Sequence, residues 1–438
     1  MKFIDLFAGL GGFHKALVEL GHECVFASEV DEELRNLYSS NFPDMKCRTF
    51  GDIRLARQKI PRHDILCAGF PCQPFSKSGY QKGLEDQELG TLFDEIVRVL
   101  ARHKPQYIIL ENVGNFERHD KGRTWRIVKQ KLIALGYDIK GTEHISSGGS
   151  GLISPHHFGY PHTRERFFIV GKLGKLPERP LPTINRYLST TLNDIVQPKH
   201  ELSENDLYET ALTAQQLDCI NLWNSLLSKM PANRVTLPSF PIWGDELDAS
   251  YPFEIQTPYA TPLKSLKLSL NGHFSDVLVA RNEILALLPS YARTKQKKFP
   301  SWKVTFIRQN REWFARHREY FTTDWISKLH SFPASLRKLE WNCQGEERDI
   351  WKHILQFRPS GLRVKRFTTS PALVAMTTTQ IPILGPQKRF LSQIEGLRLQ
   401  GFPDSFRLPS SREKSFRALG NAVHVGVVKE VARCLLTT

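Results

Sequence analysis

Cys72 lies at a position where packing in a hydrophobic core does not readily explain a cysteine. Cys72 follows Pro71 and precedes Pro74, just after the apolar run 65–68, which we expect to be a buried strand. Neither proline can donate to a sheet ladder or continue a helix, so the strand must end there. The thiol is thus expected on a stiff loop at the carboxyl end of a strand, where open α/β sheets carry their chemistry. It is a candidate nucleophile, although an isolated cysteine is more often a small buried hydrophobe.

A carboxylate and two arginines accompany other predicted strands. Glu111 ends the apolar run 107–110, and Arg164 and Arg166 lead into the run 167–170. The carboxylate faces either a loop amide or a substrate. Arginines at i and i+2 point the same way along an extended chain, so both could reach one site. The alternative for the arginines is a surface charge cluster.

The elements that would position these groups begin at the amino terminus. A short apolar run, 2–7, is closed by a glycine turn over 8–12, and residues 13–20 carry apolar side chains at helical spacing. This order of strand, glycine turn and helix is typical of the first unit of a nucleotide-binding fold, although a tight turn of this kind also occurs without a ligand.

Two acidic residues strengthen the nucleotide interpretation. Glu29 ends a second predicted strand, 24–28, twenty residues after Gly9, an offset at which a carboxylate accepts hydrogen bonds from ribose hydroxyls. Asp52 ends a third short unit and could reach an adenine amino group. Because the glycines do not spell G-x-G-x-x-G, a nucleoside ligand without a pyrophosphate is favoured over NAD.

Composition indicates a soluble protein with a polyanionic partner. The chain has 438 residues, 40% of them hydrophobic and 24% charged, with a formal net charge of +15. Such a balance favours nucleic acid, although a basic solvated surface is the plain alternative. The seven cysteines are scattered without a C-x-x-C pair, so neither a metal site nor a disulfide framework is expected. No apolar run approaches the roughly 20 residues of a membrane span, and no signal peptide is evident.

Positive charge and tryptophan gather in the second half of the chain. Residues 281–320 hold ten Lys or Arg and three Glu, a surplus of seven in forty residues, and 358–366 form a second basic strip around Gly361. Basic side chains of this kind neutralise phosphates. Five of the eight tryptophans lie within or just after the first stretch (302, 313, 325, 341 and 351), and for most of them a core position is the simpler interpretation.

In this order, the motifs resemble those of the DNA cytosine-5 methyltransferases. The matching segments cover roughly the first 175 and last 50 residues: Asp5-Leu6-Phe7-Ala8-Gly9-Leu10-Gly11-Gly12-Phe13, Pro71-Cys72-Gln73, Glu111-Asn112-Val113, Arg164-Glu165-Arg166, Arg398-Leu399-Gln400-Gly401-Phe402-Pro403 and Gly420-Asn421-Ala422-Val423. Three departures are His162 in place of the more usual Gln, Ala422 in place of Ser, and a loose segment at 391–396. None removes a candidate catalytic group.

The resemblance implies an α/β fold, a doubly wound Rossmann-like S-adenosylmethionine-dependent methyltransferase sheet with a smaller inserted target-recognition domain. We expect a catalytic and cofactor-binding domain over 1–176, a recognition domain over 177–366 and a returning segment over 367–438. A helix over 422–436 would bring Asn421 to the cofactor.

The resemblance also assigns roles to residues. Cys72 would add to C6 of cytosine, Glu111 would protonate N3, Arg166 would hold O2, and Arg164 would support the site or a nearby phosphate. S-adenosylmethionine would bind to Phe7, Ala8, Gly9, Leu10, Gly11, Gly12, Glu29, Val30, Asp52, Ile53, Pro71, Leu92, Asn421, Ala422 and Val423. A loop bearing Gln73, Ser76 and Ser78 would close over a cytosine turned out of the duplex.

The expected partner is duplex DNA with a short specific target. We expect a monomeric bacterial modification enzyme, cytoplasmic and associated with the nucleoid, with no membrane contact and with a cognate restriction endonuclease acting separately. A transfer-RNA cytosine-5 methyltransferase on the same scaffold is the close alternative, and the large basic insert favours duplex DNA. A catalytically dead DNA-binding module is a third reading, against which the intact Cys72 and Glu111 weigh.

Overall fold

The chain forms two units, one inserted into the other. The computed structural model describes residues 1–43, 49–70, 92–145, 151–184, 190–249, 253–269, 280–374 and 378–436. Unit 1 comprises Met1–Glu209, Thr368–Thr378 and Leu391–Thr438, and unit 2 comprises Thr210–Phe367 and Thr379–Phe390. Unit 1 therefore continues past residue 176 to Glu209, and it is completed by segments from the far end of the sequence.

Unit 1 is built on a twisted sheet of seven described strands in the order β3-β2-β1-β4-β5-β8-β6. Strands β3, β2, β1, β4 and β5 run parallel, whereas β8 is antiparallel to both of its neighbours. The bounds are β1 Lys2–Leu6, β2 Glu23–Ser28, β3 Thr49–Phe50, β4 Ile65–Gly69, β5 Tyr107–Val113, β6 Tyr137–Gly141 and β8 Arg166–Leu173. The predicted doubly wound α/β sheet is thereby confirmed, with one reversed strand.

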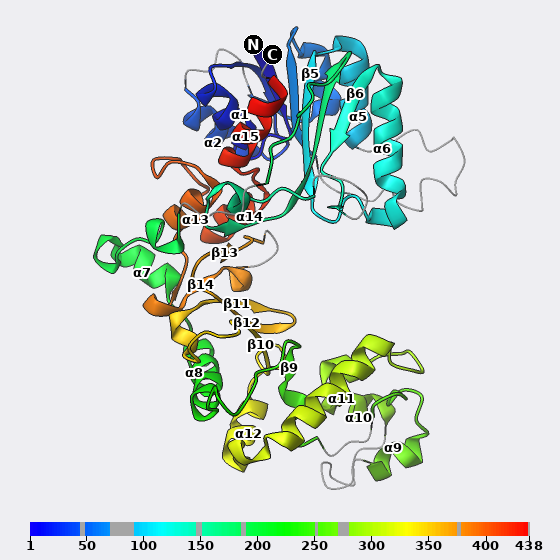
Figure 1. The fold of residues 1–438 in the computed structure, drawn as a ribbon, viewed down its shortest axis with the longest axis vertical. Coiled ribbons are helices and arrows are strands. Elements are labelled where there is room, and N and C mark those ends of the chain that lie inside the picture. Colours follow the sequence, from blue (N-terminus) through cyan, green and yellow to red (C-terminus); the bar gives the residue numbers. More distant parts are fainter. Residues whose placement is uncertain are drawn as a thin grey trace. The chain divides into compact units, whose positions relative to one another are not determined.

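Helices cover both faces of this sheet. Figure 1 shows α5 and α6 on one face and α1 and α15 on the other. A short parallel pair, β7 with β13, lies outside the main sheet. The bounds are α1 Gly12–Glu19, α2 Glu32–Asn41, α3 Ile53–Ala56, α5 Leu92–His103, α6 Arg123–Ala134, β7 His162–Thr163, β13 Ser370–Pro371, α13 Gln393–Gln400, α14 Arg412–Asn421 and α15 Val425–Leu436, with α7, Glu204–Thr210, at the end of the first segment.

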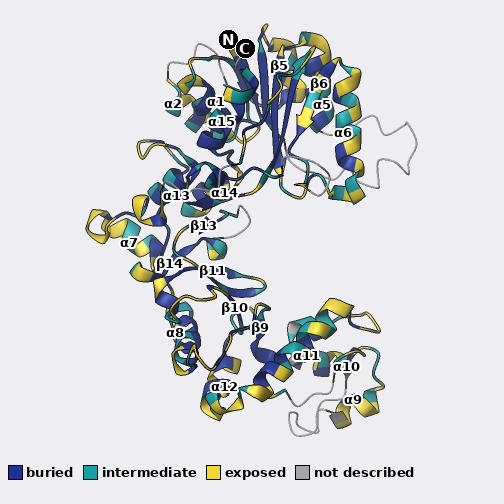
Figure 2. Cartoon of the chain, viewed as in Figure 1, coloured by how far each residue is buried: buried dark blue, intermediate teal, exposed yellow. Residues whose placement is uncertain are grey.

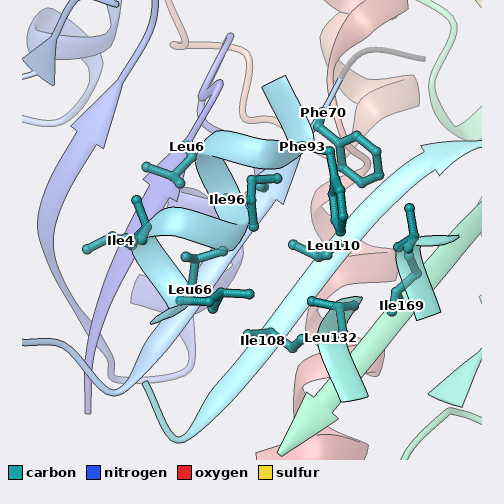
Figure 3. Packing of buried hydrophobic residues seen from close by; sticks show 14 of the residues in the cluster. Ile4, Leu6, Leu66, Phe70, Phe93, Ile96, Ile108, Leu110, Leu132 and Ile169 are labelled. Atoms are coloured by element: carbon teal, nitrogen blue, oxygen red, sulfur yellow. The ribbon is translucent and has the colours of Figure 1, made fainter. Parts of the chain in front are cut away.

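The core of unit 1 explains why its strands read as apolar runs. Alternate residues of the strands, such as Ile108 and Leu110 of β5, meet Phe93 and Ile96 of α5 (Figure 3). The intervening residues face α1 and α15, so the strands are buried on both sides (Figure 2). A parallel sheet with two covered faces requires nearly continuous hydrophobic strands, because neither face is solvated.

Unit 2 contains a second sheet and a group of helices. The sheet order is β15-β14-β11-β12-β10-β9. The bounds are α8 Ala214–Lys229, β9 Ile242–Trp243, α9 Leu263–Ser269, α10 Arg281–Leu287, α11 Ser301–Arg316, α12 Thr323–Ser331, β10 Lys338–Asn342, β11 Ile354–Arg358, β12 Gly361–Lys365, β14 Ile383–Leu384 and β15 Arg389–Phe390. Every helix among the residues described in either unit is too short or too polar to span a membrane.

Two sequence features of unit 2 find a structural explanation. Gly361 has a φ of 125°, and a Cβ there would lie 2.6 Å from the carbonyl oxygen of Lys338, so this glycine permits a close approach of the protein's own strands. Four of the five clustered tryptophans are buried, at 313, 325, 341 and 351, which confirms the core interpretation for them. Trp302 is the exception, with 55% of its surface exposed.

Candidate active site

The candidate site of unit 1 lies where β4 and β5 end side by side. Gly69 of β4 is in register with Glu111 of β5, and Gly69 is three residues before Cys72 in the sequence. The amide of Asn112 donates a hydrogen bond of 3.0 Å to the carbonyl of Phe70, which fixes the chain just after β4. The predicted residues Pro71, Cys72, Gln73, Ser76 and Ser78 lie outside the described residues.

Glu111 forms a buried ion pair with Arg166. Nε of Arg166 lies 2.9 Å from Oε1 of Glu111, whose side chain is only 10% exposed. Burial raises the pKa of Glu111, although the positive charges of Arg166 and Arg164 act in the opposite direction. The carboxyl group is therefore held in one place and retains a proton at higher pH than an ordinary glutamate. This combination suits a group that must both accept and donate a proton.

Arg164 is turned inward rather than toward a phosphate. Its Nη2 donates two hydrogen bonds of 2.8 Å, to the carbonyl oxygens of Gly420 and Ala422, and only 3% of the residue is exposed. Its backbone N–H donates to the hydroxyl of Ser154 at 2.8 Å. Burial, with the neighbouring charge of Arg166, lowers the pKa of Arg164 to about 9, so the side chain stays charged at neutral pH. The arginine supports the site from inside by holding the returning segment.

The expected helix over 422–436 is shorter than predicted. Asn421 is the last residue of α14, and α15 begins at Val425. Between them, Nδ1 of His424 accepts a hydrogen bond of 3.2 Å from the N–H of Val427 and so caps the first turn of α15. A small cavity lies beside Glu111, Arg164 and this histidine. Neither Ser154 nor His424 was singled out from the sequence; the signal for His424 was its place directly after the Gly420–Val423 motif.

The glycine turn after β1 has the backbone that its residues predict. Phe7, Gly9 and Gly11 have φ values of 56°, 54° and 80°, a region that side chains disfavour, and Gly11 is the N-cap of α1. The N–H of Gly9 donates to Oε2 of Glu29 at 2.8 Å, and Oε1 of Glu29 accepts from the N–H of Asp31 at 2.9 Å. The turn and the carboxylate predicted from their spacing are thus in direct contact.

The returning segment packs directly on this turn. A Cβ on Gly12 would lie 2.3 Å from the carbonyl oxygen of Val423, so only glycine fits. A Cβ on Gly69 would lie 3.7 Å from Glu111 and 3.9 Å from Val423. Ala422 and Val423 are buried, whereas Asn421 is exposed. The glycine turn, the end of β4 and the tail therefore converge.

The other predicted cofactor residues have varied environments. Asp52 caps α3, accepting from the N–H of Arg54 at 2.9 Å, and its ion pair with this arginine lowers the pKa of Asp52. Ile53 is buried in the core, and Val30 is 73% exposed. The N–H of Ala8 donates to the backbone carbonyl of Ser28 at 2.9 Å. Leu10 is buried, and Leu92, which is partly exposed, is the first residue of α5.

A buried polar network under the glycine turn was missed from the sequence. Asp5 is fully buried, and burial raises its pKa well above the ordinary value. The hydroxyl of Tyr38 lies 3.4 Å from Oδ2 of Asp5 and 2.7 Å from Nδ1 of His14. Desolvation lowers the pKa of His14 to about 3, so its ring is neutral. The aspartate belongs to the first quoted motif, but its position inside an apolar strand hid its partners.

These features fit a nucleoside-type ligand. A Cβ on Gly9 would meet no described heavy atom within 4 Å, so the turn is open where a ligand could approach its backbone. The buried hydroxyl of Ser28, beside Glu29, lacks a hydrogen-bond partner among the described residues. A carboxylate oxygen has two lone pairs, so Glu29 can accept from a ribose hydroxyl while it holds Gly9.

The fold and this convergence define a Rossmann-like methyltransferase domain. The chain belongs to the family described as C-5 cytosine-specific DNA methylase, which it matches over residues 1–437. Members of this family are enzymes that methylate DNA at cytosine carbon 5, and they require a methyl donor. The fold and the family predicted from the motifs are both confirmed.

Several curated proteins resemble the chain over most of its length. It is 33% identical to Type II methyltransferase M.AluI of Cellulosimicrobium cellulans, with 99% of this chain and 91% of the relative covered. It is 30% identical to M.HgiCI of Herpetosiphon aurantiacus, with 98% and 96% covered. A DNMT2 mutant of Spodoptera frugiperda shares the fold at a TM-score of 0.50 and 17% identity, covering 100% of this chain and 99% of its own.

Proposed function

We propose that the protein transfers a methyl group from S-adenosylmethionine to carbon 5 of a cytosine turned out of a specific duplex DNA sequence, through a covalent bond between Cys72 and C6. The observation that carries this proposal is the buried Glu111–Arg166 pair at the end of β5, in register with the strand that precedes Cys72. By analogy with its relatives, which are named type II methyltransferases, the protein marks host DNA against a separate cognate endonuclease.

The proposed reaction requires a nucleophile and a general acid that act on the same cytosine ring. Addition of the Cys72 thiolate to C6 breaks the C5–C6 double bond and moves negative charge toward N3, where Glu111 delivers its proton. Carbon 5 then becomes an enamine carbon that accepts the methyl group. Loss of the C5 proton to a base expels the thiolate, and the N3 proton returns to Glu111. Arg166 holds the ring O2 in this scheme while keeping Glu111 in place.

The methyl donor supplies an electrophilic methyl on a sulfonium sulfur. The proposed site for it is the glycine turn from Phe7 to Gly12, closed by Val423, with Glu29 on the ribose and Asp52 on the adenine edge. Since Asp52 is already paired with Arg54, its contribution requires one of its oxygens to accept a further hydrogen bond. Unit 2 is proposed to bind the target: its concentrated basic side chains would neutralise phosphates and fix the register, while a few polar side chains would read base edges.

Methyl transfer to duplex DNA and to tRNA tests the substrate. We expect incorporation into DNA at one short sequence context, mapped by bisulfite sequencing, and none into tRNA. Transfer to tRNA alone would instead identify the tRNA enzyme on this scaffold. A duplex with 5-fluorocytosine at the target should trap a covalent adduct, because fluorine cannot leave as a proton does. Mass spectrometry should locate that adduct on Cys72, and a duplex with ordinary cytosine serves as the control.

A further inference from the structure

Unit 2 has an open, positively charged groove that the proposed chemistry does not use. We call it the lysine groove. It encloses about 850 Å³. The described residues that line it include three cationic residues and no carboxylate: Ile255, Gln256, Tyr259, Ala260, Arg281, Lys297 and Lys298. A groove with this charge selects an anion, and its openness suits a chain that passes through rather than a small enclosed ligand.

The wall of the groove is preset by buried hydrogen bonds. Thr257 is fully buried, and its hydroxyl donates to the carbonyl of Gln296 at 2.5 Å. The N–H of Phe299 donates to the carbonyl of Ile255 at 2.9 Å, and an antiparallel bridge joins Gln256 to Lys298. Nη1 of Arg281 donates to the carbonyls of residues 258, 259 and 261, at distances of 2.9, 3.0 and 2.7 Å. The lysines therefore project from a rigid frame.

The lysines of the groove are not neutralised by any carboxylate that the structure describes. Lys297 and Lys298, with Lys295 beside them, are exposed, and no carboxylate within the described residues pairs with them. The neighbouring Glu254 is already paired with Arg308 at 2.9 Å. In the second basic strip, by contrast, Arg363 is bound to Glu340 at 2.6 Å, and Arg366 to Glu346 at 2.8 Å. Arg358 and Lys365 of that strip have no ion pair among the described residues either, but they are only partly exposed, whereas the groove lysines are exposed.

We propose that the lysine groove binds the sugar–phosphate backbone of duplex DNA and supplies affinity without reading bases. Lysine ammonium groups are point charges suited to phosphate oxygens, and contacts to phosphate carry no base information. Ile255 and Tyr259, 50% and 43% exposed, offer an apolar surface for deoxyribose. The proposal rests on the proposed DNA substrate and locates part of its binding surface.

The salt dependence of binding tests the groove. In the full-length double variant Lys297→Gln/Lys298→Gln, the plot of log K against log salt should become shallower by about 1.8, because each lost phosphate contact removes about 0.9 of slope. At 0.15 M NaCl this amounts to about 30-fold weaker binding, and the difference should shrink toward 1 M. Cognate and unrelated duplexes should lose affinity equally, while kcat at saturating DNA and the methylated sequence stay unchanged.

Lys229→Gln/Lys328→Gln, two exposed lysines of α8 and α12, is the matched control and should keep the wild-type slope. An unchanged slope in the groove variant overturns the proposal, as does a loss confined to the cognate sequence, which would mean base reading. Weaker binding of a structured RNA with unchanged duplex binding would also overturn it. If the wild-type protein methylates DNA, any of these results refutes the groove alone; failure of the wild type to methylate DNA refutes the proposed function instead.

Discussion

The two units use charge in opposite ways. In unit 1, Glu111, Arg164 and Arg166 are largely buried, and their positions are set by contacts with one another and with backbone carbonyls. In unit 2, the lysines of the groove are exposed and unneutralised by described carboxylates. Catalysis at a single base needs charges that are held in place away from water, because such charges act strongly and need not reorganise during the reaction. Attraction of a polyanion needs charges that remain in water and release counterions when they bind.

Replacing Cys72 should give the largest effect on methyl transfer. It should also distinguish most clearly the proposed catalytic role of unit 1 from the proposed DNA-binding role of unit 2. Cys72→Ala removes the proposed nucleophile, so methyl transfer should fall by on the order of 10⁴-fold or more. The dissociation constant for duplex DNA and its salt slope should stay near the wild-type values, because the exposed charges are untouched. Radiolabelled methyl transfer and fluorescence anisotropy measure the two quantities. An active alanine variant would refute the covalent mechanism.

The next largest effect is expected at Glu111. Glu111→Gln keeps a hydrogen-bond acceptor near Arg166 but cannot deliver a proton, so kcat should fall by about 10²- to 10⁴-fold. Because burial raises the pKa of Glu111, the wild-type rate should decline as the pH rises through that value and the acid form disappears. The glutamine variant should lack this alkaline decline. If the decline persists in the variant, the titrating group is another residue.

Contacts between residues close together in the sequence could be predicted from it, whereas contacts between distant segments could not. The glycine turn and Glu29 lie on adjacent strands of one βαβ unit, so their spacing predicted a contact that the structure shows between Gly9 and Glu29. The partners of Arg164 could not be predicted in the same way. They lie 256 and 258 residues away, and no periodicity relates such distant segments. The prediction that the i, i+2 arginines could reach one site fared better, because Arg164 and Arg166 line the same small cavity as Glu111.

Replacing Arg164 tests how much a buried arginine contributes to stability, and an exposed arginine of the same chain, Arg417, serves as the control. Arg164→Met removes the donor for two buried carbonyls, so the free energy of unfolding should fall by about 3 kcal/mol, and cofactor binding should weaken as the 420–423 segment loosens. Arg417→Met breaks the exposed pair with Glu413 at 2.9 Å and should change stability by less than about 0.5 kcal/mol. Urea unfolding compares them. Equal losses in both variants would contradict a special role for Arg164.

The smallest effect is expected at Asp5, when stability is compared at low pH. Its pKa is raised by burial, so the stability contributed by the protonated form is present at low pH and is lost as the pH rises through the folded-state value. Asp5→Asn mimics the neutral acid and should be within about 1 kcal/mol of wild type at low pH. It should become relatively more stable as the pH rises. Thermal melts across a pH series measure the difference, and parallel curves would argue against a buried neutral acid.

The packing of Gly12 against Val423, with the bonds from Arg164 to Gly420 and Ala422, affects how the enzyme matures during translation. Every motif of the first 175 residues leaves the ribosome before unit 2 is made, yet the pocket they outline lacks its last wall until the final helix emerges. A nascent or prematurely terminated chain is therefore expected to be inert, so methylation is expected to begin only once unit 2, the proposed recognition unit, has been made.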